Sequence, residues 1–143
     1  MVTHWFRRRW LIALVVAMVS VVSVAPAHAQ SITTFSIDPR GTFDPHTGQA
    51  TISGTIACSE PLAGFIEVSL QQRAGRLIVV GSGFTDVACS PEGTTWSVTV
   101  SGPGRFAGGQ ALASARAEFV VDGNTITAET SQQVRLRGAP SKR

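Results

Sequence analysis

Apolar and polar residues alternate, position by position, through most of the sequence after residue 29. In the segment 50–58 the even positions are mainly apolar and the odd positions mainly carry hydroxyl groups. The same alternation occurs in the segments 66–71, 96–101, 111–119 and 126–136. Successive side chains of a β-strand point to opposite faces, so the pattern predicts strands with one buried and one solvated face. No segment after residue 29 has the period of an amphipathic helix, and we expect an all-β fold.

Turn residues separate these runs of alternation. The pair Asp122-Gly123, between Val121 and Thr125, is the strongest hairpin signal in the chain. About seven short strands, with a turn every 8 to 12 residues or so, are typical of an antiparallel β-sandwich. The other turn signals are Pro39-Arg40-Gly41, Pro45-His46-Thr47-Gly48, Arg73-Ala74-Gly75-Arg76 and Ser90-Pro91-Glu92-Gly93.

The first 29 residues have the pattern of a signal peptide. Arginines at 7–9 precede an apolar run over 10–25, and small residues stand at Ala27 and Ala29 behind Pro26. We expect a leader helix that is cleaved between Ala29 and Gln30. The alternative, an uncleaved anchor, is less favoured because the apolar run falls short of the roughly 20 residues that span a bilayer. The choice between the general secretory and the twin-arginine route stays open.

The predicted organisation is therefore a signal peptide over 1–29, a sandwich domain over 30–137 and a flexible tail over 138–143. The processed protein is expected to be secreted into the extracellular space as a monomer, without membrane attachment. The whole chain has 12 basic and 9 acidic side chains, and three of the basic ones lie in the leader. The folded part is thus balanced in charge, which argues against a nucleic-acid partner.

Cys58 and Cys89 are the only two cysteines of the chain. Cys58 shares the parity of Ile52 and Ile56, so its sulfur is expected to point inward, and Cys89 likewise shares the parity of Val87. An exported domain with two cysteines favours a disulfide that joins the two layers, rather than free or metal-binding thiols. Closing a loop of this size stabilises the fold by about 3 to 4 kcal/mol in the chain-entropy treatment.

Alanines occupy every second position from Ala111 to Ala117, on the parity predicted to face the core. Such small side chains make room for a larger neighbour or line a thin part of the sandwich. The first interpretation would place Trp96 or the disulfide over this alanine stripe. Both interpretations remain open from the sequence.

Between Asp44 and Trp96 the chain has a set of spaced residues: Gly48, segment 50–58, Gln72, Gly75, Val87-Ala88-Cys89 and Trp96. This set is similar to that of small exported immunoglobulin-like domains, found mainly in actinobacteria and other environmental bacteria. The resemblance continues through Phe106 and the alanine stripe. It implies an immunoglobulin-like sandwich without an assigned activity or catalytic residues. Trp96 follows both cysteines, whereas the tryptophan of antibody domains lies between them.

Few residues of the processed chain could perform catalysis. His46 is its single histidine, beside Asp44 in a Pro/Gly turn, and the chain has no tyrosine. With both cysteines bridged, no thiol nucleophile remains. Glu67, Glu118 and Glu129 have outward parity and are interpreted as surface residues. The glycine-rich segment 102–109 lacks the Lys-Ser/Thr of a phosphate loop and is interpreted as a flexible connection.

We therefore expect a protein that is not an enzyme and has no cofactor or metal ion. The favoured function is binding to a protein or to a cell-envelope or extracellular component, with the end loops as the main contact surface. Two alternatives are a carrier of a small apolar ligand and a secreted inhibitor or hydrolase that uses the end loops and His46. Three phenylalanines near turns, each a candidate binding anchor or core residue, are Phe43, Phe84 and Phe106.

Overall fold

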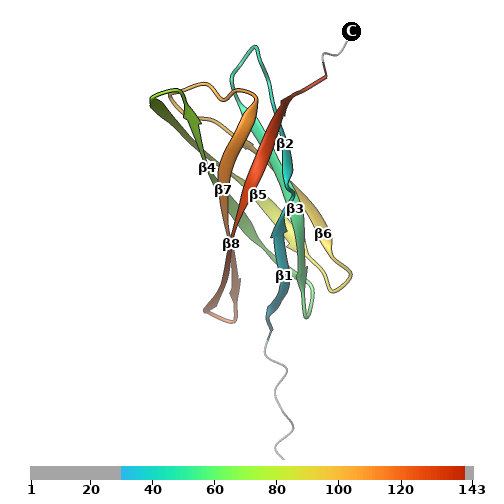
Figure 1. Ribbon diagram of the computed structural model, residues 1–143. Helices are drawn as coiled ribbons and strands as arrows, with labels where there is room; N and C mark the ends of the chain where they lie inside the picture. Colours follow the sequence, from blue (N-terminus) through green and yellow to red (C-terminus); the bar gives the residue numbers. More distant parts are fainter. Residues whose placement is uncertain (1–29, 141–143) are drawn as a thin grey trace, which may run out of the picture.

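The computed structural model describes residues 30–140, and all regular structure in this range is β-strand (Figure 1). The predicted signal peptide and the residues 141–143 of the predicted tail lie outside it. No helix in the described range could cross a membrane. The eight strands are β1 (Ile32–Ile37), β2 (Arg40–Phe43), β3 (Ala50–Cys58), β4 (Leu62–Ala74), β5 (Leu77–Cys89), β6 (Thr94–Val100), β7 (Gly109–Val121) and β8 (Asn124–Gly138).

The strands form two facing layers, which confirms the predicted β-sandwich. One layer has the order β5-β4-β7-β8, with antiparallel pairing throughout. The other has β3 between β1 and β6, again antiparallel. Short strand β2 joins the layers at one edge, because it pairs with both β3 and β8. The described chain starts at one end of the long axis and finishes at the other (Figure 1).

The sheet is mixed rather than fully antiparallel, and it has eight strands instead of about seven. The segment read as a Pro39-Arg40-Gly41 turn instead starts β2, which pairs in parallel with β8. The chain changes partner at Pro39: the N–H of Asp38 still donates to Ser53, while the carbonyl of Pro39 accepts from the N–H of Arg135. A side chain at Gly41 would meet the Thr51 carbonyl oxygen at 2.9 Å, so glycine permits the close passage of β2.

The core consists of the inward-facing residues that the alternation predicts. Ile52 and Ile56 of β3 are fully buried, as are Val68 and Leu70 of β4 and Phe119 of β7. Burial of such aliphatic and aromatic side chains stabilises a fold by about 1.5 to 3 kcal/mol each. Burial therefore confirms the predicted parity in β3, β4, β6 and β7, and in β8 at Val134 and Leu136.

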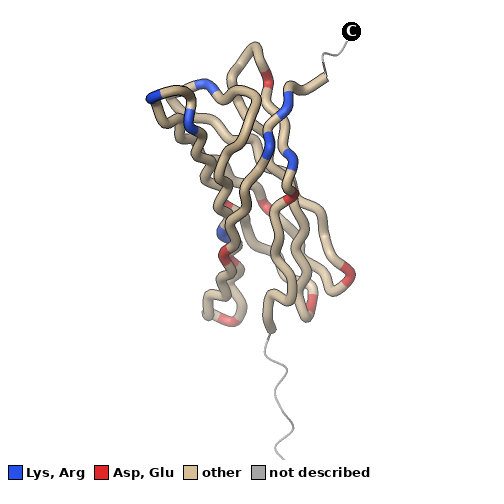
Figure 2. Tube along the Cα trace, in the orientation of Figure 1, with Lys and Arg blue, Asp and Glu red and all other residues tan. Residues whose placement is uncertain are grey.

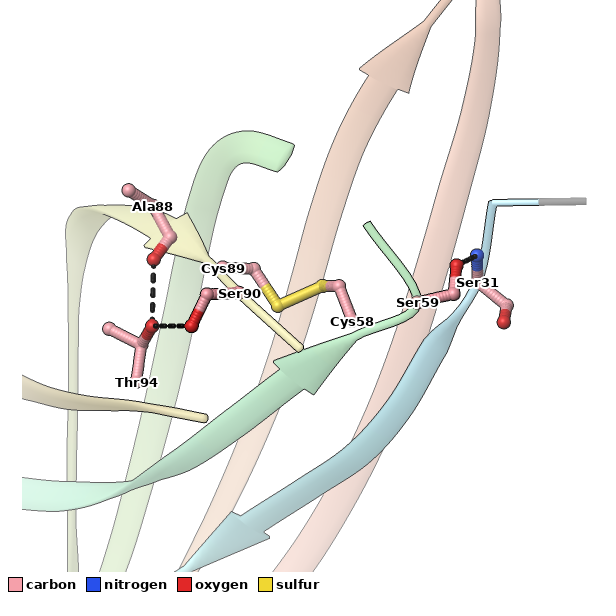
Figure 3. Close-up of a disulfide and its surroundings, with 7 residues drawn as sticks. All are labelled: Ser31, Cys58, Ser59, Ala88, Cys89, Ser90 and Thr94. Atoms are coloured by element: carbon pink, nitrogen blue, oxygen red, sulfur yellow. Dashed lines mark hydrogen bonds between the residues drawn. A yellow bond between two sulfur atoms is a disulfide. The ribbon is translucent and has the colours of Figure 1, made fainter. Parts of the chain in front are cut away.

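The disulfide between Cys58 and Cys89 is formed, and both residues are almost completely buried (Figure 3). Cys58 ends β3 and Cys89 ends β5, so the bond joins the two layers, as predicted. Hydrogen bonds fix the chain around it: the Thr94 hydroxyl donates to the Ala88 carbonyl at 2.9 Å, and the Ser31 N–H donates to the Ser59 hydroxyl at 2.9 Å. The bridge therefore closes one end of the sandwich.

The predicted Asp122-Gly123 hairpin and the predicted turn over 73–76 are both present. Asp122 and Gly123 have φ values of 48° and 78°, the left-handed pair that a two-residue hairpin turn requires. Gly75, with φ 66°, closes the β4–β5 hairpin. At the C-terminus β8 runs through Gly138, one residue beyond the predicted domain boundary.

Trp96 packs within its own layer. Its ring lies beside Phe35, with centroids 6.0 Å apart, and over Gly54, where a Cβ would come within 2.6 Å of the indole. Gly54 therefore provides the space for this ring. The alanines of the stripe are themselves between 0 and 3% exposed.

Replacing both cysteines by alanine should lower the free energy of unfolding by about 3 to 4 kcal/mol, because the unfolded chain regains the entropy of an open loop. Urea unfolding of the protein and the double variant, each with and without reductant, measures this. Reductant should destabilise only the protein that has both cysteines. Equal stability of the two proteins without reductant would contradict the assignment.

Ala115→Leu should destabilise the protein by about 1 to 3 kcal/mol, since the added methylenes have no space in a buried, well-packed position. Gln110→Leu adds apolar bulk on the exposed side of the same strand and serves as the control. Its effect should stay within about 0.5 kcal/mol. A thermal midpoint unchanged by Ala115→Leu would show that the alanine stripe borders unfilled space.

Candidate functional site

His46 lies exposed in the turn between β2 and β3, with Asp44 two residues before it. Its backbone N–H donates to Asp44 Oδ1 at 2.8 Å, and this hydrogen bond lowers the pKa of the Asp44 carboxyl. The interaction involves the His46 backbone rather than its imidazole, and it stabilises the turn. The arrangement is that of a surface turn and gives the imidazole no built site.

The glycine-rich segment 102–109, interpreted as a flexible connection, is held at several points. The Arg105 guanidinium donates to the carbonyl oxygens of Pro45 and His46 at 2.6 and 2.9 Å. The buried Gln72 amide bonds both the carbonyl and the N–H of Ala107. Phe106 is buried in the core, so this phenylalanine is no binding anchor. The loops at this end of the sandwich therefore form a fixed structure.

The outward surface of the β5-β4-β7-β8 layer, here called the outer face, places polar residues from four strands in rows. One row consists of serines, one from each strand, and we call it the serine row. Ser69 pairs with Ser82 on one side and with Ser114 on the other, and Ser114 pairs with Ser131. Ser114 and Ser131 also share a hydroxyl–hydroxyl hydrogen bond of 3.1 Å. All four serines are exposed.

Two shallow hollows lie along the serine row. One, of about 280 Å³, lies over β4, β7 and β8 and is bordered by Ser69, Ser114 and Ser131. The other, of about 330 Å³, lies where β5 meets the end of β6, and Phe84 borders it. Both include Glu67, so they adjoin. The middle of the outer face is thus a low polar strip, because serine is the smallest polar side chain there.

On one side of the serine row the outer face is acidic and aromatic. In the row next to the serines, Glu67 and Glu129 lie on either side of Arg116. The Arg116 Nη2 atom lies 3.7 Å from Oε2 of Glu118. Phe84 begins this row on β5 and is 78% exposed. We call this side the acidic half; its outward residues include Phe84, Glu67, Arg116, Glu129, Asp86, Phe65, Glu118 and Val120.

On the other side of the serine row the outer face is basic and aliphatic, and we call it the basic half. Val80, Gln71, Leu112 and Gln133 form the first row beyond the serines. The basic segments of the molecule gather at this end, where the β4–β5 hairpin and the end of β8 lie, and most acidic segments lie elsewhere along the axis (Figure 2). Its remaining outward residues include Arg73, Ile78, Gln110, Arg135 and Arg137, with Arg76 and Leu77 in or beside the hairpin turn.

The structure places side by side several residues that are far apart in the sequence. Glu67 and Glu129 were expected as surface residues on separate strands, and in the structure they share a row with Arg116. Of the three phenylalanines expected near turns, Phe84 instead lies within β5 and is largely exposed, while Phe43, at the end of β2, packs against the core. The sequence does show one outward serine in each of the four strands. That these serines form a row follows only from the order and register of the strands.

No protein-family model matches this sequence, and no curated protein is similar to it. Among residues 30–140, no group of three or more His, Cys, Asp or Glu side chains is placed to hold a metal ion. The outer face is therefore the candidate site that the described geometry supports best.

Proposed function

We propose that this protein is a secreted, non-catalytic immunoglobulin-like module that binds a protein or a cell-envelope or extracellular component through its outer face. The observation that carries the proposal is the exposure of large apolar side chains on both sides of the serine row. Phe84 and Val120 are 78 and 65% exposed, and Ile78 and Val80 about half exposed. Groups of exposed apolar residues among polar ones are typical of interaction surfaces.

Export is supported by two features that agree. The leader has a basic start, an apolar run and small residues before Gln30. The buried disulfide is compatible with an oxidising, extracellular environment.

The immunoglobulin-like assignment is supported by a three-stranded and a four-stranded layer with a disulfide between them. The molecule differs from antibody domains in the position of this bond, which joins the ends of β3 and β5. Trp96 lies on β6, after both cysteines, and packs on β3 through Gly54. These differences concern the core and leave the outer face exposed.

A binding role fits the chemistry of the surface better than catalysis or transport. The backbone N–H of His46 donates to Asp44, so the hydrolase alternative has no positioned base. The carrier alternative would use space beside the alanine stripe, but these alanines are packed in the core. The outer face offers hydroxyl, amide, charged and aromatic groups over one continuous area.

Ser114→Arg should abolish binding, because it places a long charged side chain at the centre of the serine row. Ser97→Arg, on the outward side of β6 in the opposite layer, is the matched control: both serines are exposed and hydrogen-bonded to a serine of a neighbouring strand. The processed chain and both variants are tagged, immobilised and exposed to the secreted and envelope fractions of the native host.

The protein and Ser97→Arg should retain the same component, and Ser114→Arg should lose it. Circular dichroism and the thermal midpoint establish that both variants are folded. Recovery of the component by Ser114→Arg at an undiminished level would exclude the outer face as the site.

A further inference from the structure

We propose that the partner of the outer face is a second copy of this chain, related by a two-fold axis that runs along the serine row. This inference rests on the proposed function and names the partner of the same face. Its basis is that the two halves of the face, which the serine row separates, have opposite charge. Four acidic residues and one arginine point outward from the acidic half: Glu67, Asp86, Glu118, Glu129 and Arg116. Three arginines and no acidic residue point outward from the strands of the basic half: Arg73 on β4, and Arg135 and Arg137 on β8.

A two-fold axis along the serine row turns one sheet to face the other and reverses its strand direction. Each strand then lies near its own copy, and the basic half of one molecule covers the acidic half of the other. Such an isologous contact closes with two molecules. A two-fold axis parallel to the strands would instead place each half over its own copy, so that halves of like net charge meet. The net charges of the halves therefore favour the first arrangement.

The register gives the facing rows within β5 and β4. One row from the axis, Val80 of one copy faces Phe84 of the other, which is an apolar pair. In β4, Gln71 faces Glu67, and two rows from the axis Arg73 faces Phe65, where a guanidinium can stack on an aromatic ring. Arg73 also lies only one row from the second copy's Glu67. The long arginine side chain can span that separation and form an ion pair.

On β8, too, the residues next to the axis form a pair that can interact across it. Gln133 and Glu129 are each one row from Ser131 on opposite sides, so the amide of one copy faces the carboxylate of the other. At the axis itself, the short serine side chains let the two sheets approach and can exchange hydroxyl hydrogen bonds. The hollows over the serine row provide space for the larger side chains of the opposing copy.

The size of the face suits a stable dimer. Strands β4, β5 and β7 have 13 residues each, and β8 has 15. At about 3.4 Å per residue and about 4.8 Å per strand, four strands present about 800 Å². Standard protein–protein interfaces bury about 800 Å² per partner. The proposal is therefore a symmetric dimer, whereas the expectation from the sequence is a monomer.

Sedimentation velocity and equilibrium of the processed chain, purified with its disulfide intact, test the proposal. We expect a dimer with a dissociation constant of about 10 μM or lower. Ser114→Arg should raise that constant about 100-fold, and Ser97→Arg should leave it unchanged. Because the halves attract through charge, raising the salt from about 0.1 to about 1 M, which shortens the screening length from about 10 to about 3 Å, should weaken the dimer.

A charge exchange within β4 provides a second test that inserts no bulky residue at the axis. Arg73→Glu and Glu67→Arg each place like charges near one another across the axis, so each should raise the dissociation constant about tenfold. The double variant Arg73→Glu/Glu67→Arg restores opposite charges and should return to within about threefold of the original value.

Self-association and capture of a host component are measured separately, so either proposal can fail without the other. A folded chain that remains monomeric at about 100 μM, or a dimer that Ser114→Arg leaves intact, would overturn the self-association. If such a monomer still captured a host component in a manner sensitive to Ser114→Arg, the proposed function would stand with a different partner. A monomer that captured nothing would contradict both.

Discussion

The register between β4, β7, β8 and β5 is the constraint on which the rest of this molecule depends. Side chains in a strand alternate between faces, so a shift of one residue would exchange the inner and outer sets. In the observed register Ala113, Ala115 and Phe119 are buried while Ser114 and Arg116 are exposed. The same pairing therefore creates the apolar core and the serine row.

Separate interactions hold the two layers together at their ends and edge. At one end the disulfide joins β3 to β5. At the other, Arg105 and Gln72 fix the glycine-rich loop to the turn before β3 and to β4. Along one edge β2 bonds to both layers. These interactions fix the four-stranded layer through its inner face, its ends and one edge. Its outer face takes no part in them and remains exposed.

Much of this architecture could be predicted from the residues, because its determinants are local. The alternation of apolar and polar residues predicts which side of a strand is buried, and Asp122-Gly123 predicts a hairpin. The positions of Cys58 and Cys89 in this alternation predict that both sulfurs lie in the core. The parallel pairing of β2 was missed because Pro39-Arg40-Gly41 has the composition of a turn. Its actual role depends on hydrogen bonds to Ser53 and Arg135, which are distant in sequence. The rows of the outer face were missed for the same reason, since Glu67, Arg116 and Glu129 become neighbours only through the strand order.

Nuclear Overhauser effects between backbone protons of facing residues measure this register in solution most directly. Cross-strand contacts are expected between Ser69 and Ser114 and between Ser114 and Ser131, with Ser82 opposite Ser69. Contacts displaced by one or two residues in any of these three pairs would break the serine row and contradict the account.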